Sequence, residues 1–338
     1  MADAFLKLSR QDRRDALGVA ADRSGRPAHL LEKDVWVVWA LAALYASPLG
    51  ADLVFKGGTS LSKAYNVIRR FSEDVDLTYD IRALAPDLVR GRAEALPTTR
   101  AEERRWTRDI RQLLPRWVQS CARQVIAQAL EAEGLEAALR VDGDRLFIDY
   151  GTDTPGTGYV APSVMLEFGA RSTGEPASIR SIACDAAGFV AGLTFPTAET
   201  RVMHAERTFW EKATAIHVFC RQARLRGERF ARHWHDVIRL DEAGFADKAF
   251  ADRALATAVA RHKTMFFEEK AFDGSPIDYL EAVNGALRLV PENNGAVVLA
   301  DDYARMIDDG LLLEPAETFD DLIEKCRALE ARANHVAR

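Results

Sequence analysis

The 338-residue sequence predicts an α+β fold with a C-terminal helical domain. Helical and strand patterns alternate between residues 29 and 80, strand patterns follow one another from 138 to 203, and almost every pattern after 204 is helical. We therefore expect an α/β domain with N-terminal helices over residues 1–203, and a helical domain over residues 204–338.

The composition is that of a globular protein, with 48% hydrophobic and 28% charged residues. The four cysteines form no CxxC pair, which argues against a disulfide framework and against a zinc site. The N-terminal residues do not show the basic start and apolar run that are typical of a signal peptide. The most apolar stretch, residues 35–55, is broken by Pro48 and Gly50, so it is too short to span a bilayer. We expect a cytoplasmic protein without a membrane segment.

The first elements follow from the apolar pattern. Residues 29–47 are apolar nearly all round, which predicts a buried helix that ends at Pro48–Gly50. Residues 52–57 then predict a short buried strand, 60–70 a helix, and 74–80 a second strand. Charge pairs spaced i,i+4 favour a long amphipathic helix over the segment that comes next, about 98–134.

The β region begins with a predicted hairpin at residues 138–150, with Asp142–Gly143 at its turn. A strong strand pattern at 159–171 follows, and three weaker ones complete the region at 176–184, 188–195 and 200–204. In the helical half, residues 284–299 are rich in glycine and asparagine and predict a loop or small hairpin.

A strand, a Gly-Gly turn, a helix and a return strand form one compact unit between Phe55 and Asp80. The two glycines let backbone N–H groups approach an anion, and the helix that follows adds the positive end of its dipole. The candidates for nucleotide binding at this turn are Gly57, Gly58, Thr59, Ser60 and Lys63.

The return strand carries Asp74 and Asp76, which share one face because side chains alternate along a strand, while Val75 and Leu77 face the core. Adjacent carboxylates repel unless a cation lies between them, and Mg²⁺ prefers such oxygen ligands. The simpler interpretation is an exposed strand face. The order and spacing favour a site, because the fifteen residues between Gly58 and Asp74 suffice for one helix and a return. A triphosphate beside a DxD-bound Mg²⁺ is the machinery of nucleotidyl transfer.

Two further acids compete to be a third metal ligand. Glu167 lies on an apolar strand and needs a partner, which is either the metal or a structural salt bridge such as one to Arg171. Asp149, in the strand pattern before it, is the alternative for the same role.

The helical half contains a lysine and an aspartate in unusual places. Lys212 falls within an apolar helical stripe, where its ammonium either snorkels to water or meets a partner. Asp236 lies in a helix where it could pair with Arg232, four residues earlier. His233 and His235 diverge on that helix, which favours packing over metal binding.

The net charge is −6, but a nucleic-acid site needs only a local basic groove. Residues 221–232 carry five arginines against one acid, Glu228. The run is either a phosphate-binding surface or a solvated loop between two helices, and charge alone does not separate the two.

The segment 55–80 resembles the polymerase-β-like nucleotidyltransferase core, whose signature is a hydrophobic residue, Gly-Gly or Gly-Ser, a helix and Dx[DE], built on a mixed sheet. More narrowly, "KGGTSLSKAY…RFSEDVDL" is similar to the AbiEii/AbiGii toxin family, which includes the MenT toxins. The resemblance extends in order over "LEKDVWV", "VMLEFGARS", "HAERTFWEKATAIH", "RHWHDVIRL" and "HKTMFF".

This resemblance implies a toxin of a toxin–antitoxin or abortive-infection pair that transfers NMP from an NTP to an RNA acceptor, with the tRNA 3′ end as the best attested target. It matches Lys212 to the family's phosphate-contacting lysine, and Asp236 to an aspartate that activates or positions the acceptor. Mg²⁺ (or Mn²⁺) would be held by Asp74 and Asp76, and a cognate antitoxin is expected. The two halves of the chain would then each supply part of one site.

Two other functions fit the same residues. Nucleotidyl transfer to a protein hydroxyl would need the same metal and phosphate groups with a different acceptor groove. A non-catalytic module that binds nucleotide or antitoxin would be expected if the DxD pair or Lys212 had been lost, and both are present.

Overall fold

The computed structural model describes residues 3–72, 74–154, 161–222, 229–292, 294–308 and 312–337. By internal contacts the chain divides into two compact units. The sheet unit comprises Met1–Ala64, Glu73–Ala95 and Trp106–Met203, and the helical unit comprises Tyr65–Ser72, Leu96–Arg105 and His204–Arg338. The C-terminal part of the helical unit thus begins at His204, but two short earlier segments are grouped with it.

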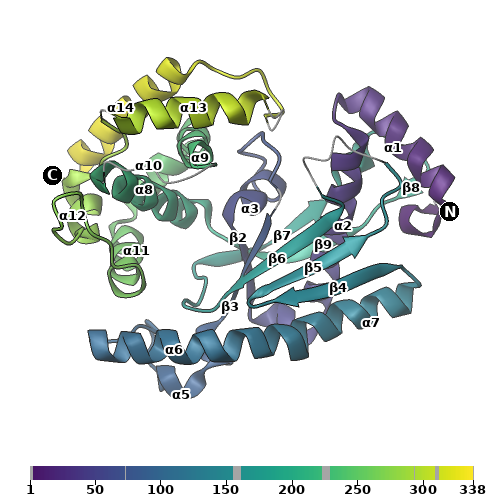
Figure 1. Ribbon diagram of the computed structural model, residues 1–338, viewed down its shortest axis with the longest axis horizontal. Coiled ribbons are helices and arrows are strands. Elements are labelled where there is room, and N and C mark those ends of the chain that lie inside the picture. The colour runs from purple at the N-terminus through teal and green to yellow at the C-terminus, as the bar shows by residue number, and fades with distance from the viewer. Residues whose placement is uncertain are drawn as a thin grey trace. The chain divides into compact units, whose positions relative to one another are not determined.

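The sheet unit is built on a seven-stranded mixed sheet in the order β4-β5-β6-β3-β2-β9-β7 (Figure 1). The β3–β6 and β2–β9 pairs are parallel and the other neighbours are antiparallel. This confirms the predicted α+β class with a mixed sheet. The strands are β2 Leu53–Lys56, β3 Asp74–Tyr79, β4 Ala137–Asp142, β5 Arg145–Tyr150, β6 Ser163–Gly169, β7 Ala177–Ala183 and β9 Thr197–Met203.

Apolar alternation accounts for the central strands. In β6 the side chains of Val164, Leu166 and Phe168 are buried and their neighbours are partly exposed, so one face of the strand packs in the core. Helix α2, Ala28–Ala46, packs against β9 and β6 of the sheet, and its predominantly apolar sequence explains why most of its side chains are buried. The remaining helices of this unit are α1 Arg10–Ser24, α3 Gly57–Lys63, α4 Ile81–Leu84, α5 Pro86–Val89 and α7 Arg123–Glu133.

The long helix predicted over 98–134 exists as α6 Arg100–Trp117, a π-helical turn at Val118–Ala122, and α7. The predicted hairpin is β4–β5, with the two-residue turn at Gly143–Asp144 rather than at Asp142–Gly143, since Asp142 already pairs with Arg145. Gly143 has φ +60°, a conformation that favours glycine and suits a two-residue hairpin turn.

Three predicted elements differ from the structure. Helix α3 ends at Lys63 and not at residue 70, because the chain from Tyr65 leaves the sheet unit and Asn66 adopts φ +53°. Residues 188–195 form only the two-residue strand β8, Leu193–Thr194, which pairs with β1, Asp3–Ala4. In the 284–299 segment the described residues 287–292 form a loop, and the next helix begins at Asn294.

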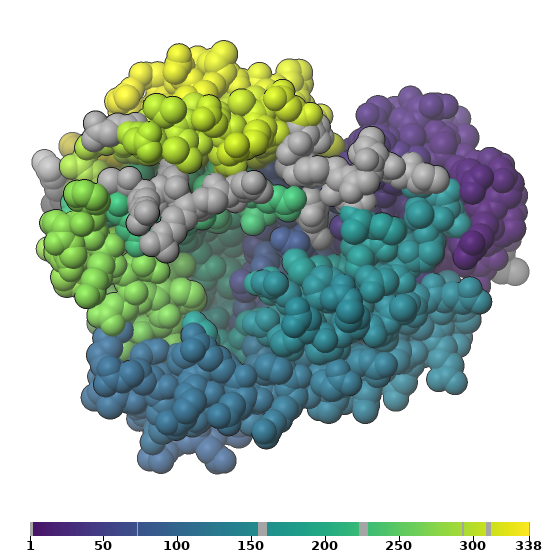
Figure 2. Space-filling view, viewed as in Figure 1, coloured from purple at the N-terminus to yellow at the C-terminus, as the bar shows by residue number. Residues whose placement is uncertain are grey.

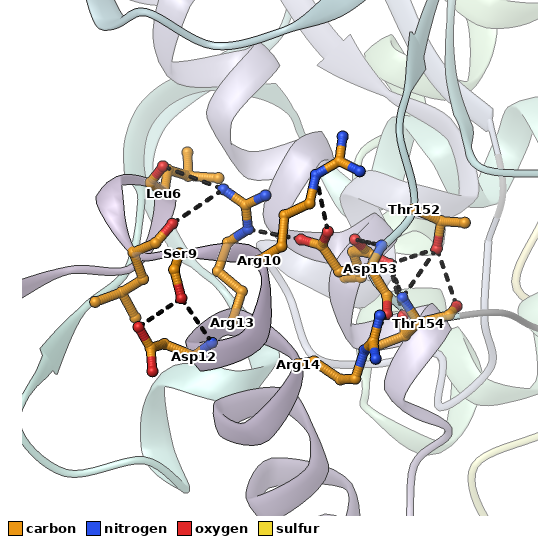
Figure 3. A network of polar contacts seen from close by, with 11 residues as sticks. Leu6, Ser9, Arg10, Asp12, Arg13, Arg14, Thr152, Asp153 and Thr154 are labelled. Carbon is orange, nitrogen blue, oxygen red and sulfur yellow. Dashed lines mark hydrogen bonds and ion pairs between the residues drawn. The ribbon is translucent and has the colours of Figure 1, made fainter.

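A buried polar network fixes the N-terminal helix α1 to the loop after β5 (Figure 3). Asp153 has an almost fully buried carboxylate, and it accepts a hydrogen bond from Arg13 at 2.6 Å. Arg14 donates to the Asp153 carbonyl at 2.8 Å, and Glu32 of α2 accepts from the backbone N–H of Asp153 at 2.8 Å. Arg13, Arg14 and Glu32 thus hold a segment without regular structure. Asp153 Oδ1 accepts no hydrogen bond from the described residues and lies 3.8 Å from Arg10 Nε.

A second buried cluster connects α2, α3 and the 3-10 turn at Asp185–Gly188. Lys63 Nζ lies 2.6 Å from Asp34 and 2.7 Å from Asp185, and the lysine side chain is 7% exposed. Burial opposes the charge on Lys63, but the two carboxylates outweigh it and raise its pKa. Burial raises the pKa of Asp34 in turn, although Lys63 acts against that shift.

The helical unit packs around large aromatic side chains. Trp210 and Phe250 meet Phe209, and the indole of Trp234 donates to the Leu289 carbonyl at 2.7 Å, so a loop is tied into the core. In the space-filling view the green α11–α12 stretch forms part of the surface of this unit (Figure 2). Its helices are α8 Ala205–Gln222, α9 Ala231–Glu242, α10 Phe245–Ala251, α11 Arg253–Phe266, α12 Tyr279–Glu281, α13 Asn294–Asp308 and α14 Phe319–Val336.

Across the described ranges, no helix combines the length and the apolar character that crossing a bilayer requires.

The buried cluster around Lys63 predicts a specific stability effect. Lys63→Met should lower the free energy of unfolding by about 3–5 kcal/mol, because it leaves the buried Asp34 carboxylate without its cation. Adding Asp34→Asn should recover most of that loss, since Asp185 keeps Arg26 as a partner. Urea unfolding measures both. Lys7→Met, at an exposed lysine of the same unit, is the control, and equal effects at Lys63 and Lys7 would contradict the assignment.

Candidate functional site

The two aspartates of β3 project from the face of the sheet opposite the core. Val75 and Leu77 are fully buried, and Asp74 and Asp76 alternate with them and are partly exposed. This is the arrangement that the period-two pattern predicts. In the antiparallel pairing of β2 with β3, Asp76 lies opposite Lys56, the residue directly before the Gly-Gly turn.

The Gly57 backbone lies directly against the Asp76 carboxylate. Gly57 has φ +76°, and a Cβ built at this position would overlap the Asp76 carboxylate, nearest its Oδ2 atom. Both the backbone conformation and the close approach therefore require glycine here. The structure brings together the first glycine of the turn and the second aspartate of the DxD pair, which are nineteen residues apart in sequence.

The hydroxyl groups of Thr59 and Ser60 form hydrogen bonds that stabilise the turn itself. Thr59 Oγ1 donates to the Asp74 carbonyl, which ties α3 to β3. Ser60 Oγ donates to the Gly57 carbonyl at 2.9 Å and is fully buried. Gly58 is also buried, and the Lys63 ammonium is engaged by Asp34 and Asp185. These two ion pairs explain why a lysine is buried at this position without the need for a bound nucleotide.

Glu167, and not Asp149, is the neighbour of the DxD pair. The parallel register pairs Glu167 of β6 with Asp76, so both side chains lie on the same face of adjacent strands. Asp149 pairs with Ser163, four residues or roughly 13 Å along β6 from Glu167. The Glu167 carboxylate accepts from Arg145 at 3.0 Å, so its ion-pair partner is Arg145 and not the Arg171 that we considered.

The carboxylates of Asp74, Asp76 and Glu167 lie on one face of the sheet, and carboxylate oxygens are the ligands that a hard divalent cation prefers. Gly57 leaves space beside the Asp76 carboxylate that any side chain at this position would fill. Within the described residues, however, no three His, Cys, Asp or Glu side chains already stand close enough together to hold a metal ion. A two-carboxylate site from Asp74 and Asp76 is therefore the minimal metal site that the strand offers, and Glu167 would first have to leave Arg145 to join it.

A buried cluster in the helical unit centres on Asp236 of α9. Its side chain is fully buried, and Arg70 grips it with Nε–Oδ1 at 2.7 Å and Nη2–Oδ2 at 2.8 Å. Lys212 of α8 lies 2.9 Å from the same Oδ2 atom, with its side chain 11% exposed. The lysine in the apolar stripe thus has an ionic partner, and Asp236 is held by a residue 166 positions away and not by Arg232.

This environment decides what Asp236 can do. Burial would raise its pKa, but the charges of Arg70 and Lys212 outweigh burial and hold the pKa far below its ordinary value. A buried carboxylate with both oxygens engaged and a strongly lowered pKa is a poor proton acceptor. The geometry instead suits Asp236 to fixing the position of the Lys212 ammonium.

Of the two histidines beside Asp236, His235 is buried and His233 is partly exposed, although the Nδ1 atom of His233 is buried. Burial, with a smaller contribution from Lys212, lowers the pKa of His233 well below its usual value. Burial also lowers the pKa of His235 to about 4, and both ring nitrogens of His235 are buried without a hydrogen-bond partner in the described structure. Burial therefore disfavours the charged form of both rings.

Arg70 is a residue that the sequence pattern did not single out. It lies in the segment between the Gly-Gly turn and the DxD strand, directly after Arg69, and no local pattern distinguishes it from a surface charge. Of the arginine run 221–232, positions 223–228 lie outside the described residues, so the groove predicted there has no structural description.

Comparisons with known proteins relate the chain to a toxin family. Residues 39–325 match the family described as "Nucleotidyl transferase AbiEii toxin, Type IV TA system". MenT4, a nucleotidyltransferase toxin from Mycobacterium tuberculosis H37Rv, is 19% identical over 98% of this chain and 99% of its own, with a TM-score of 0.41. JHP933 from Helicobacter pylori is 14% identical over 91% and 92%, with a TM-score of 0.43. Among curated protein sequences nothing matches.

The family match includes the Gly-Gly turn, the DxD strand, Lys212 and Asp236, and it extends over most of the chain. It confirms the resemblance inferred from these segments. The chain belongs to the AbiEii nucleotidyl transferase toxin family of type IV toxin–antitoxin systems.

Proposed function

We propose that this toxin transfers NMP from an NTP to an RNA acceptor in a metal-dependent reaction, with the 3′ end of tRNA as the target, and so blocks translation in the cytoplasm. The acceptor hydroxyl attacks the α-phosphate in line, a P–O bond to the acceptor forms, and pyrophosphate leaves. The observation that supports the proposal is the contact of the Gly57 backbone with the Asp76 carboxylate, because it brings the Gly-Gly turn next to the DxD strand.

Asp74 and Asp76 are the residues that would hold Mg²⁺ or Mn²⁺. The metal would neutralise the charge that develops on the phosphoryl oxygens. The protein's own contribution is to fix the two carboxylates on one strand face, and Gly57 and Gly58 would present backbone N–H groups to the NTP phosphates. The buried hydroxyls of Thr59 and Ser60 hold this turn in shape and do not reach out of it.

In the helical unit, Lys212 would supply the cation to the triphosphate. Asp236 would act as a positioning residue, because it holds the lysine ammonium while Arg70 holds the carboxylate. A cation that is already oriented by a buried partner loses less conformational entropy when it meets a phosphate. The family also implies a cognate antitoxin as the partner that restrains this activity.

The proposed reaction is tested by incubating the full-length protein with Mg²⁺, each labelled NTP and total RNA. We expect label on tRNA with wild type and none with Asp76→Ala. Label on protein would instead favour transfer to a protein hydroxyl. If no NTP gave label on any acceptor, the chain would be a nucleotide-binding or antitoxin-binding module.

Gly57→Ala is predicted to reduce transfer by about 10²-fold or more, because the new Cβ displaces the Asp76 carboxylate. Gly143→Ala is the matched control: it also places alanine at positive φ, +60°, but its Cβ would meet nothing within 4 Å. The two variants should therefore share the backbone strain and differ in initial transfer rate. Equal rates for Gly57→Ala and Gly143→Ala would show that the contact with Asp76 has no part in the reaction.

Lys212→Met is predicted to reduce transfer by about 10²–10³-fold with little change in stability, because Asp236 keeps both contacts from Arg70. Asp236→Asn should weaken NTP binding as Lys212→Met does if Asp236 positions the lysine. NTP affinity by calorimetry and transfer rate by gel assay separate the roles. Unchanged NTP affinity with lost transfer in Asp236→Asn would favour a direct role toward the acceptor.

A further inference from the structure

A polar pocket of about 380 Å³ lies within the helical unit, where the end of α8 meets the loop before α12, the loop after the π-helical turn Ala282–Ala286, and α14. Its lining combines two arginines, Arg221 and Arg288, with the imidazole of His217. His217 lies five residues after Lys212 on α8, which turns it roughly 140° around the helix axis. The pocket therefore opens on a different side of α8 from the Lys212–Asp236 pair.

The wall that carries Arg288 is rigidly built. Asn334 of α14 accepts from the Leu287 N–H at 2.8 Å and donates to the Leu287 carbonyl at 3.0 Å. Glu330 accepts from the Leu289 N–H at 2.5 Å, and His217 Nδ1 accepts from the Arg288 N–H at 3.1 Å. A loop fixed by three side chains forms the pocket wall before any ligand binds.

The His217 ring is held as a neutral hydrogen-bond donor. Burial, with the positive charges of Arg221 and Arg288, lowers its pKa to about 4. Because Nδ1 accepts a hydrogen bond, the ring proton resides on Nε2. No acceptor for Nε2 is found among the described residues, so the pocket presents one neutral N–H beside two guanidinium groups.

The loop next to this pocket carries an exposed phenylalanine, Phe272. Phe272 is 84% exposed, which is unusual for phenylalanine, and its backbone N–H donates to the Arg221 carbonyl at 3.1 Å. The loop that carries it is closed by the Ala271–Ser275 hydrogen bond and continues directly into Pro276 and Ile277, which line the pocket. The backbone of Phe272 is therefore anchored beside Arg221, a residue of the pocket lining, and its side chain is exposed.

Two carboxylates share the pocket with the arginines. Asp278 caps α12 by accepting from the N–H groups of Leu280 and Glu281, so part of its charge is already satisfied. Glu281 is exposed and lines the same cavity. A simple anion would meet repulsion here, whereas a nucleotide offers a phosphate for the arginines and amino groups on its base edge for the carboxylates.

We propose that this pocket, with Phe272 of the adjacent loop, binds one nucleotide of the RNA acceptor at a point separate from the transfer site. Arg221 and Arg288 contact the phosphate, His217 donates a hydrogen bond, and the base stacks on Phe272, as bases do in single-stranded RNA complexes. The RNA partner rests on the proposed function, and the pocket rests on the geometry described above. The site would secure the acceptor strand while its end reacts elsewhere.

The test measures binding of fluorescein-labelled tRNA, and of a short single-stranded RNA, to the full-length protein in EDTA without NTP. Phe272→Ala should weaken binding about 5- to 100-fold, and Phe272→Trp should preserve it. Arg288→Gln should weaken binding and reduce the slope of log K against log salt by about 0.7. Arg305→Gln is the matched control, since Arg288 and Arg305 are both 57% exposed and each faces one carboxylate, at 3.7 and 3.8 Å.

The outcomes separate this site from the transfer reaction. If the wild-type protein transfers label to RNA, and the Phe272→Ala and Arg288→Gln variants bind RNA normally, the proposed role of the pocket in RNA binding is wrong. The proposed function is then left intact. Absence of RNA binding in wild type would overturn the pocket. Loss of antitoxin binding in these variants, with RNA binding unchanged, would assign the surface to the protein partner instead. Photo-crosslinking of 5-iodouridine RNA to the Phe272 loop, lost in Phe272→Ala, is the expected positive result.

Discussion

The buried carboxylate of Asp236 is the interaction on which the helical unit depends most. An isolated buried charge would be strongly destabilising, and Arg70, which contacts both carboxylate oxygens, together with Lys212 supplies the opposite charge that Asp236 needs. Satisfying it joins three separate pieces of chain: the segment before the DxD strand, helix α8 and helix α9. Removing the carboxylate would leave two buried or nearly buried cations facing each other. The same requirement that stabilises the unit therefore also orients the lysine proposed to meet the nucleotide.

In the sheet unit, a glycine allows the backbone to approach a carboxylate closely. Placing two carboxylates side by side on a strand is unfavourable, and a close backbone approach to one of them is possible only if the approaching residue has no Cβ. Gly57 meets that condition, while Thr59 and Ser60 turn their hydroxyls inward and fix the turn. The turn is thus shaped by its own side chains, and its backbone is what remains available for a ligand.

Sequence patterns predicted the fold class, the central strands and the shared face of Asp74 and Asp76, because these follow from local alternation of apolar residues. They did not predict Arg70, since an arginine that will be buried by a partner 166 residues away carries the same local pattern as a surface arginine. The ion pair of Glu167 with Arg145 was missed for a similar reason: the partner depends on strand register, and the local sequence equally allowed Arg171. Lys63 was assigned by its proximity to the turn, although its ammonium faces Asp34.

The composition of the two units has a practical meaning for dissecting the protein. Residues 65–72 and 96–105 precede the boundary at His204 and yet find their contacts in the helical unit. A fragment cut at Met203 would keep Arg70 while deleting the carboxylate that neutralises it, and would leave both segments without the core they pack on. A cut near residue 204 therefore does not divide this chain into two fragments that could fold independently. A fragment that contains only the sheet unit would need the segments 65–72 and 96–105 to be removed or replaced.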